Sequence, residues 1–187
     1  YNILGIPYHP PELREGEPMP NIPIDLVDDE VVCVDIHMHS TYSDGADTII
    51  DMARHAKVNG LACIGISDHL AKSMIGHALY SQPELFDKRQ VEIQEASKET
   101  GLTVLSGVEV DISLDGNLEF PEEFDDTKLD YVMASIHSSP GKDVQHRLIS
   151  AIKSGKVHII GHCTGRAFGV RPSAENVDWD EVFRAAH

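Results

Sequence analysis

The sequence predicts an α/β fold built around a parallel sheet, and two observations support this prediction. From Val31 onward, short apolar runs of strand length alternate with longer segments that have the period of an amphipathic helix. The runs are also apolar on both faces, as strands are when helices cover both sides of a parallel sheet. Five strand-helix units are too few to close an ordinary eight-stranded barrel.

The boundaries of the expected elements follow from the apolar runs and from the residues that end them. The expected strands are Val31–His39, Leu61–His69, Leu102–Ile112, Tyr131–His137 and Val157–His162. The expected helices are Thr48–Asn59, Glu84–Thr100, Glu122–Lys128, Val144–Ser154 and Trp179–His187. Three glycines fall where a helix gives way to a strand, and we expect each to end its helix in a left-handed conformation: Gly60, Gly101 and Gly155. Thr48 and Asp51 fit a capping box at the first helix, with Asp47 as an alternative cap.

The chain divides into a connector and one domain. Residues 1–28 are too rich in proline for an interior helix or a central strand, so we expect a connector there. Residues 29–187 have the length of a single domain, and the whole chain has globular proportions, with 41% hydrophobic and 25% charged residues. No apolar run approaches the roughly 18 residues that a membrane helix needs. We therefore expect a soluble, cytoplasmic protein with no membrane partner, and three cysteines without a Cys-x-x-Cys pair agree with a reducing compartment.

The charge of the chain limits how it can bind nucleic acid. Fifteen Lys and Arg against 31 Asp and Glu give a formal net charge of −16. This is the wrong sign for a surface that binds a phosphate backbone by releasing counterions. Any affinity for nucleic acid must come from bound cations or from a separate basic domain.

Imidazoles and carboxylates stand at the carboxyl end of every expected strand. In chain order they are His37 and His39, Asp68 and His69, Glu109, His137, and His162. Because the carboxyl ends of parallel strands meet at one edge of the sheet, we expect these side chains to converge. His37 and His39 are two residues apart on a strand, so their imidazoles project from the same face and can chelate one ion. The sequence therefore predicts a metal site.

The ligand types indicate the metal and the reaction. Mixed nitrogen and oxygen ligands suit Zn, Mn or Fe rather than Mg or Ca, and several imidazoles with one shareable carboxylate suit a cluster of ions. Clustered transition metals activate water for attack at phosphorus and neutralise charge on the attacking and leaving oxygens. We expect two to three divalent metals and a phosphoester hydrolase.

The chain resembles the PHP (polymerase and histidinol phosphatase) superfamily in five motifs. These are the run from Asp35 through His37 and His39 to Asp44, then Ser67-Asp-His69, Gly107-Val-Glu109, His137 and Gly161-His162. The resemblance implies a distorted (β/α)7 barrel that holds up to three metal ions. The superfamily's final motif, an Asp and a His, has no counterpart here, so we expect a barrel without its last strands and a domain incomplete at its C-terminus.

The resemblance also implies a role for each matching residue. One metal would be held by His37, His39 and Glu109, a second by Glu109, His137 and His162, and a third by Asp44 and His69. Glu109 would bridge the first two. Asp68 resembles a carboxylate that orients a ligand imidazole.

Within the superfamily, the chain is most similar to the C-terminal domain of bacterial and archaeal family X DNA polymerases. The run Leu4-Gly-Ile-Pro-Tyr-His-Pro-Pro-Glu-Leu-Arg-Glu15 resembles the junction between the polymerase core and its PHP domain. In that branch the domain is a Mn-dependent 3′-to-5′ exonuclease that cleans DNA 3′ ends during repair. The resemblance therefore implies DNA 3′ ends as substrate and a polymerase core upstream in the same chain.

Arg166 is the last candidate residue of the site. Arg166 follows the His162 strand, where its guanidinium could hold a substrate phosphate; it could equally be a surface arginine paired with a carboxylate. With Glu109 and Asp68 it forms the set expected to take part in catalysis.

Two other functions compete with the exonuclease. A small-molecule phosphatase of the histidinol-phosphate type would use the same metals, and a PHP domain can also stabilise a polymerase without chemistry of its own.

Overall fold

The computed structural model describes residues 33–72, 76–122, 124–139, 141–163 and 177–187. These residues belong to one unit, Cys33–His187. The connector expected at residues 1–28 and Arg166 lie outside the described residues. Within the described part of the chain, every helix falls short of the length and apolar character that a membrane crossing needs.

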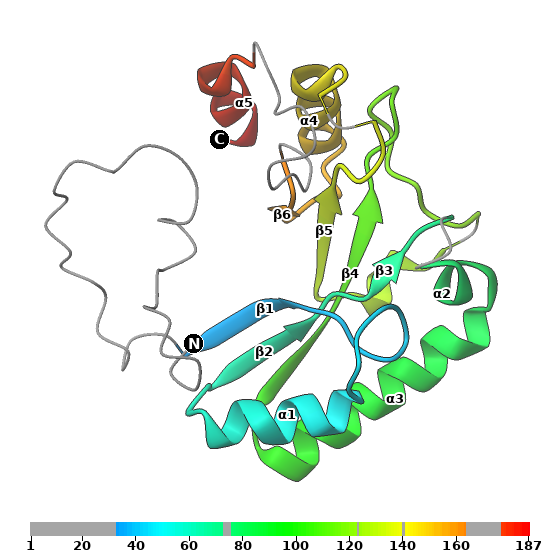
Figure 1. Ribbon diagram of the computed structural model, residues 1–187, viewed down its shortest axis with the longest axis vertical. Helices are drawn as coiled ribbons and strands as arrows, with labels where there is room; N and C mark the ends of the chain where they lie inside the picture. The colour runs from blue at the N-terminus through cyan, green and yellow to red at the C-terminus, as the bar shows by residue number, and fades with distance from the viewer. Residues whose placement is uncertain (1–32, 73–75, 123, 140, 164–176) are drawn as a thin grey trace, which may run out of the picture. The chain divides into compact units, whose positions relative to one another are not determined.

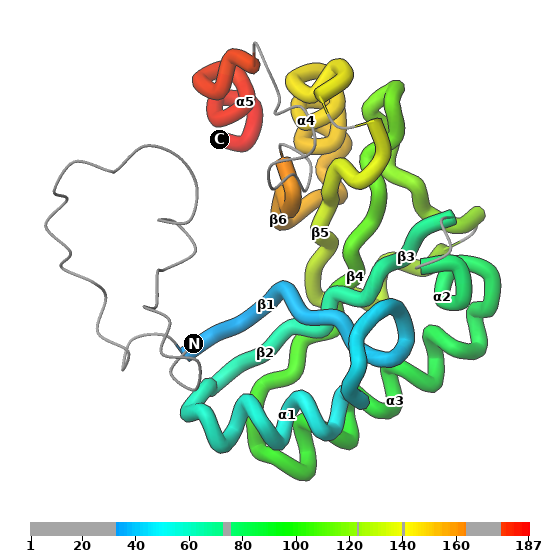
Figure 2. The backbone as a smooth tube through the Cα atoms, in the orientation of Figure 1, coloured from blue at the N-terminus to red at the C-terminus, as the bar shows by residue number. Residues whose placement is uncertain are grey.

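A curled parallel sheet forms the centre of the unit and confirms the predicted α/β fold (Figure 1). Its described strands are β1 (Val34–Met38), β2 (Cys63–Ile66), β3 (His69–Leu70), β4 (Thr103–Asp111), β5 (Tyr131–Ser135) and β6 (Ile159–Ile160). The order across the sheet is β1-β2-β4-β5-β6, with β3 paired to β4 beyond the end of β2. All pairs are parallel. The sheet curves into a half-barrel, as the tube in Figure 2 shows, in agreement with a partial PHP barrel.

Helices cover the outer face of the sheet (Figure 1). They are α1 (Ile49–Val58), α2 (His77–Ser81), α3 (Pro83–Thr100), α4 (Val144–Lys153) and α5 (Trp179–Ala186), with one 3-10 turn, η4 (Asp126–Lys128). Thr48 caps α1 by accepting from the amide of Asp51, as predicted. Gly60, Gly101 and Gly155 have φ of 80°, 71° and 71°, which confirms their left-handed conformation after the helices.

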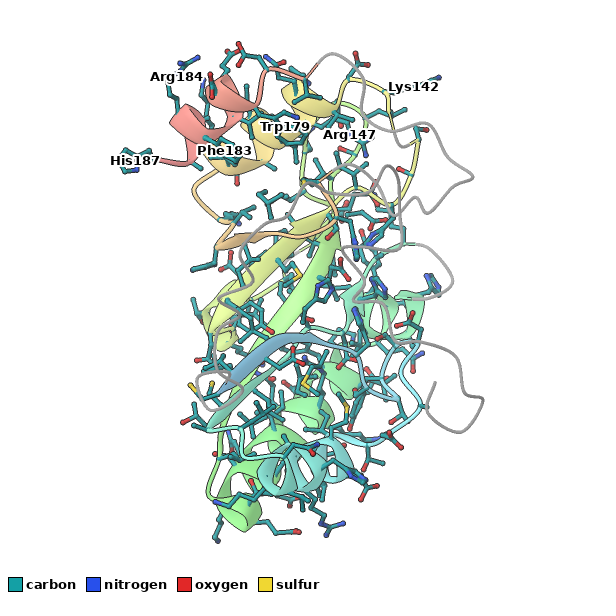
Figure 3. All side chains as sticks on the ribbon, turned by 60° about the vertical axis from the view of Figure 1, so that its left-hand side comes forward. Lys142, Arg147, Trp179, Phe183, Arg184 and His187 are labelled. Carbon is teal, nitrogen blue, oxygen red and sulfur yellow. The ribbon has the colours of Figure 1, made fainter. Side chains whose placement is uncertain are left out.

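Two apolar clusters hold the helices to the sheet. One packs α1 and α3 against β2 and the start of β4, through residues such as Ile49, Ile66 and Ile93. The other packs α4 against β4 and β5, through residues such as Val110 and Leu148. Trp179 of α5 is a partly buried member of this second cluster and lies beside α4 in Figure 3.

The two faces of β4 differ toward its carboxyl end, where the expectation that the strands are apolar on both faces is wrong. Side chains alternate along a strand. Along β4, Val108 and Val110 enter the apolar cluster under the helices. The alternate positions hold Gly107, Glu109 and Asp111 instead. The inner face of β4 is polar at Glu109 and Asp111 because these positions belong to the candidate site.

Two further predictions of secondary structure were wrong in detail. The strand expected over Leu61–His69 is broken at Ser67 and Asp68, which separate β2 from β3; β2 pairs with both β1 and β4, and β3 pairs with β4. The helix expected over Glu122–Lys128 is reduced to the 3-10 turn of η4. The short helix α2 was not predicted.

A tyrosine spans the inner face of the sheet from β5 to β1. The hydroxyl of Tyr131 donates to the carbonyl of Ile36 at 2.7 Å. Its ring crosses β4 and β2 at Gly107 and Gly65, where a Cβ atom would lie 2.1 Å and 2.5 Å from the nearest ring or hydroxyl atom. The two glycines therefore make room for the ring, and the ring ties the sheet to the residue that precedes His37.

Candidate metal centre

The carboxylate of Glu109 lies at the centre of five imidazoles that come from four different stretches of the chain. The side chain is fully buried, at 0% exposure. Its Oε2 atom lies 3.3 Å from a ring nitrogen of each of His37, His39 and His69. Its Oε1 atom lies 3.3 Å from His137 and 3.5 Å from His162. The convergence expected from the strand ends is therefore present.

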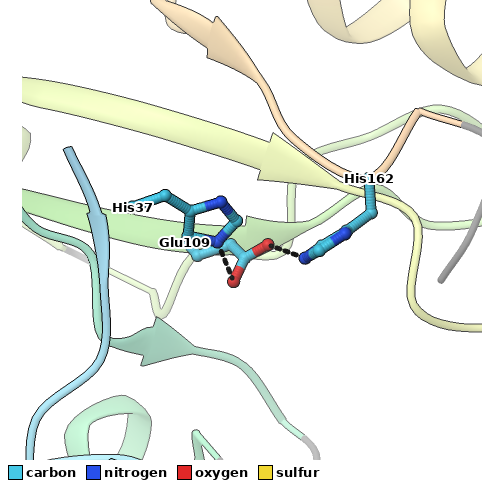
Figure 4. Close-up of side chains that lie close together, drawn as sticks. All are labelled: His37, Glu109 and His162. Atoms are coloured by element: carbon cyan, nitrogen blue, oxygen red, sulfur yellow. Dashed lines mark ion pairs between the residues drawn. The ribbon is translucent and has the colours of Figure 1, made fainter. Parts of the chain in front are cut away.

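The two oxygens of Glu109 face different sets of imidazoles. Figure 4 shows His37 on one side of the carboxylate and His162 on the other, each joined to its own oxygen. A carboxylate in this position has the geometry to serve two ions at once.

Asp44 forms a second centre beside the first. Its Oδ1 atom lies 3.5 Å from His39 Nδ1 and 3.7 Å from His69 Nε2. The rings of His39 and His69 stack with their centroids 4.4 Å apart. The residues His37, His39, Asp44, His69 and His162 line an open pocket of about 400 Å³.

Three sets of potential ligand atoms each lie within 4.8 Å of one another. They are His37, Glu109 and His162; His39, Asp44 and His69; and His69, Glu109 and His137. The sets contain all seven residues expected as ligands. In these sets His39 lies with Asp44 and His69, whereas the family resemblance places it with His37. Similarly, His162 lies with His37, whereas the resemblance places it with His137.

The chemistry of the site fits a cation. Among the described residues, two buried atoms at the centre, His39 Nδ1 and Glu109 Oε2, find no hydrogen-bond partner. Such orphaned buried atoms are costly unless something else satisfies them. A divalent metal ion between imidazole nitrogens and carboxylate oxygens would do so.

The electrostatics of the site keep Glu109 ionised. Burial opposes ionisation, but the imidazoles of His137, His37 and His39 and the hydroxyl of Ser135 outweigh it and hold the pKa of the Glu109 carboxyl well below its usual range. A carboxylate that stays charged is available as a metal ligand.

Asp111 is a site residue that the sequence analysis missed. It follows Glu109 by two positions on β4, so both side chains project from the inner face. His137 Nδ1 lies 2.5 Å from Asp111 Oδ1, which turns the other nitrogen of the ring toward Glu109. Burial by itself would lower the pKa of His137, but Asp111 and Glu109 raise it to about 9. The two-residue spacing from Glu109 was the signal that could have identified Asp111.

Asp68 contacts no imidazole among the described residues, which corrects the expectation that it orients one. Its carboxylate accepts from the amide and hydroxyl of Ser40, from the hydroxyl of Ser43, and from Arg89. Two other carboxylates contact site imidazoles through the nitrogen that faces away from Glu109: Asp111 contacts His137, and Asp44 contacts His39 and His69.

Comparisons with known proteins agree with this arrangement. Residues 35–166 match the PHP domain family. The chain is 34% identical over 192 aligned residues to a Bacillus subtilis protein named DNA polymerase/3′-5′ exonuclease PolX, with all of this chain and 33% of the relative covered. It is 32% identical to a probable phosphatase of Vibrio parahaemolyticus, covering 82% of this chain and 58% of the relative. It is 36% identical to a probable phosphatase of Caldanaerobacter subterraneus, covering 69% of this chain and 51% of the relative.

The chain thus spans about one third of the polymerase relative and a little over half of the two phosphatase relatives. The shared domain and the names of these relatives support a phosphoesterase. Together with the convergence of His37, His39, Glu109, His137 and His162 on one edge of a curled parallel sheet, the family match shows that the chain belongs to the PHP domain family.

Proposed function

We propose that the protein is a metal-dependent phosphoesterase that removes nucleotides from DNA 3′ ends, acting as the Mn-dependent 3′-to-5′ exonuclease domain of a family X DNA polymerase in DNA repair. The single observation that carries the hydrolase part is the convergence of five imidazoles on the buried carboxylate of Glu109. The nuclease part is supported by similarity along the whole chain to the Bacillus subtilis polymerase and exonuclease.

The residues of the chain would share the work as follows. Glu109 would place one oxygen on each of two metal positions, with His37 and His39 on one side and His137 and His162 on the other. Asp44 and His69 would hold a third ion next to His39. Two to three divalent ions of Mn, Zn or Fe, when bound, supply an activated water and neutralise charge on the phosphoryl oxygens. Arg166 would hold a substrate phosphate through its planar guanidinium.

The proposal includes the organisation of the parent protein. Residues 1–28 would connect a polymerase core upstream to the metallo-phosphoesterase domain of residues 29–187. The core would also supply the positive surface that this chain, with its net charge of −16, cannot offer to DNA. Free cysteines agree with action in the cytoplasm.

A small-molecule phosphatase is the second candidate, and the relatives from Vibrio parahaemolyticus and Caldanaerobacter subterraneus favour it. A structural domain without chemistry is the third. The presence of the seven expected ligands around the site argues against that third reading.

One experiment separates the three candidates. The purified chain is supplied with Mn at low salt and given a 5′-labelled oligonucleotide or a small phosphomonoester. We expect stepwise shortening of the oligonucleotide from its 3′ end, its loss with EDTA, and its loss in Glu109→Gln. Glu95→Gln, an exposed carboxylate on α3, is the matched control and should keep full activity.

The other outcomes identify the other candidates. Efficient cleavage of the phosphomonoester with the oligonucleotide untouched would replace the nuclease with a metabolic phosphatase. Bound metal without cleavage of either substrate would favour the structural domain.

A further inference from the structure

A buried ion pair outside the metal cluster joins the segments that carry His39, Asp44 and His69. Arg89, on α3, and Asp68, between β2 and β3, are both at 0% exposure, with Arg89 Nε 2.7 Å from Asp68 Oδ2. Arg89 Nη2 also donates to the carbonyls of Ile66 and Gly107, each at 2.7 Å. Arg89 is therefore fixed to the end of β2 and to the middle of β4.

Asp68 in turn holds the loop between β1 and α1. The amide of Ser40 donates to Asp68 Oδ1 at 2.7 Å, and the hydroxyl of Ser43 donates to the same oxygen at 2.9 Å. The hydroxyl of Ser40 lies 2.9 Å from each oxygen of the carboxylate. These two serines lie between His39 and Asp44 in the chain.

One carboxylate thus sets the positions of three candidate ligands. His39 immediately precedes Ser40, Asp44 immediately follows Ser43, and His69 immediately follows Asp68. Because the network is buried and every oxygen of Asp68 is engaged, it holds a single arrangement of the loop. Removal of one partner leaves a buried charge or hydrogen-bonding group without compensation, so the arrangement is not easily replaced.

The ligands on the other side of Glu109 have a different support. His137 is held by Asp111, and Glu109 Oε1 accepts from the hydroxyl of Ser135. Neither of these contacts involves Arg89 or Asp68. The side-chain contacts that support the two parts of the cluster are therefore different, while the backbone joins them, since the amide of Glu109 donates to the carbonyl of Asp68 at 3.0 Å.

We propose that Arg89 and Asp68 are positioning residues for the metal ion held by His39, Asp44 and His69, and that this ion can be weakened without loss of the ion held by Glu109, His137 and His162. The inference rests on the proposed function, since it requires metal at the cluster. Arg89 contacts none of the candidate ligands directly and would act through Asp68. A change at either residue would alter the occupancy of one metal position without altering that of the other.

The test is a Mn titration of the full chain by calorimetry and elemental analysis, with folding checked by circular dichroism. The variants are Ser43→Ala, Asp68→Asn and Arg89→Lys. Each should weaken the Mn site of His39, Asp44 and His69 by about 10- to 100-fold and leave the site that includes Glu109 and His162 unchanged. Ser43→Ala removes one hydroxyl from a half-buried position, so it keeps the test available if a buried variant does not fold.

Matched controls separate positioning from general damage. Thr127→Ala removes a hydroxyl that bonds a carboxylate, Asp125, in η4 outside the cluster. Arg147→Met removes an arginine that is also at 0% exposure and that donates to the carbonyls of Ser138 and Ile112. Neither residue contacts the loop between β1 and α1, and both controls should keep the site of His39, Asp44 and His69 at wild-type affinity.

Double variants assign the affected ion. Ser43→Ala combined with Asp44→Asn should bind no less Mn than Asp44→Asn alone, because both changes act on one ion. Ser43→Ala combined with His137→Ala should weaken Mn binding at both sites. Additive losses in the first pair would overturn the assignment.

A measurement on the metal-free chain tests the support itself. In Asp68→Asn and Arg89→Lys, the amide of Ser40 should exchange its hydrogen at least tenfold faster than in the wild type, while amides of β5 keep their protection. A wild type that binds no Mn would refute the proposed function. In another outcome, the wild type binds Mn while the variants have the same Mn affinity at every site and the same exchange rate at the Ser40 amide. That result would refute the role of Arg89 and Asp68 and leave the proposed function standing.

Discussion

Substitution of Gly107 by alanine tests how the inner face of the sheet is built. A Cβ atom at this position would lie 2.1 Å from Cζ, 2.4 Å from Cε1 and 2.5 Å from Cε2 of Tyr131. Real Cβ atoms do not approach other atoms so closely, so the ring must move. A ring that moves also leaves the carbonyl of Ile36, to which its hydroxyl now donates.

The expected loss of stability follows from these two effects. Overpacking of a well-packed interior costs about 1–3 kcal/mol. Loss of one buried hydrogen bond adds about 1 kcal/mol. We therefore expect Gly107→Ala to lower the free energy of unfolding by about 2–4 kcal/mol, measured by urea denaturation followed by circular dichroism.

A second background shows whether the ring is the cause. In Tyr131→Ala, which is itself strongly destabilised, the ring is absent and the new methyl group has room. Gly107→Ala should then cost less than about 1 kcal/mol, which gives a coupling energy of at least about 1 kcal/mol between the two positions. Equal costs in both backgrounds would mean that the glycine is required for a reason other than the tyrosine ring.

Three further predictions concern the site and the same tyrosine. Glu109→Gln should reduce the number of bound Mn ions by more than one and abolish phosphoesterase activity, whereas Asp44→Asn should remove at most one ion; equal losses by elemental analysis would mean that Glu109 does not bridge. Asp111→Asn should weaken Mn binding by about 10-fold, because His137 loses the carboxylate that orients its ring, and calorimetry should detect this. Burial raises the pKa of Tyr131 above its usual value of 10, so the unfolded chain ionises first and stability is lost as the pH rises above 10. Tyr131→Phe should therefore lose less stability between pH 9 and pH 11 than the wild type does, in urea denaturation at the two pH values.

The convergence of the candidate ligands could be predicted from the sequence because their positions depend on one simple rule. Parallel strands bring their carboxyl ends to one edge, so His37, Glu109 and His137 could be assigned to a common site without knowledge of how the strands pack. The ends of the helices could be predicted equally well, because a glycine such as Gly101, which adopts the left-handed conformation, ends a helix and is recognised in the local sequence.

The break between β2 and β3 could not be predicted in the same way. The apolar run ends at Ile66, and Ser67, Asp68 and His69 follow it before Leu70, so the run alone does not show whether the strand continues through these polar residues. The pairing on each side of the break depends on residues far away in the chain, because β2 pairs with both β1 and β4, whereas β3 pairs with β4. Tertiary contacts of this kind leave no mark in the local sequence.

Arg89 is an intermediate case, because its signal was present but was not recognised. The buried face of α3 is formed by Phe86, Arg89, Ile93 and Ala96, at spacings of three and four residues. A charged residue in the middle of an apolar stripe is buried with it unless the helix turns, and a buried arginine requires partners. The sequence therefore indicated a polar network under α3 but not which strand ends would supply the acceptors.

The same pattern recurs on α4, and the repetition has a physical reason. The buried face of α4 contains Arg147 between Val144 and Leu148, and Arg147 donates to carbonyls that follow β4 and β5. Where parallel strands end, carbonyl groups leave the ladder and need new donors if they are buried. A guanidinium carries five N–H donors in one plane and can satisfy several carbonyls from one helix position. Arginines on the buried faces of α3 and α4 can thus support the strand ends that carry the metal ligands, while the inner face remains free for the ligands themselves.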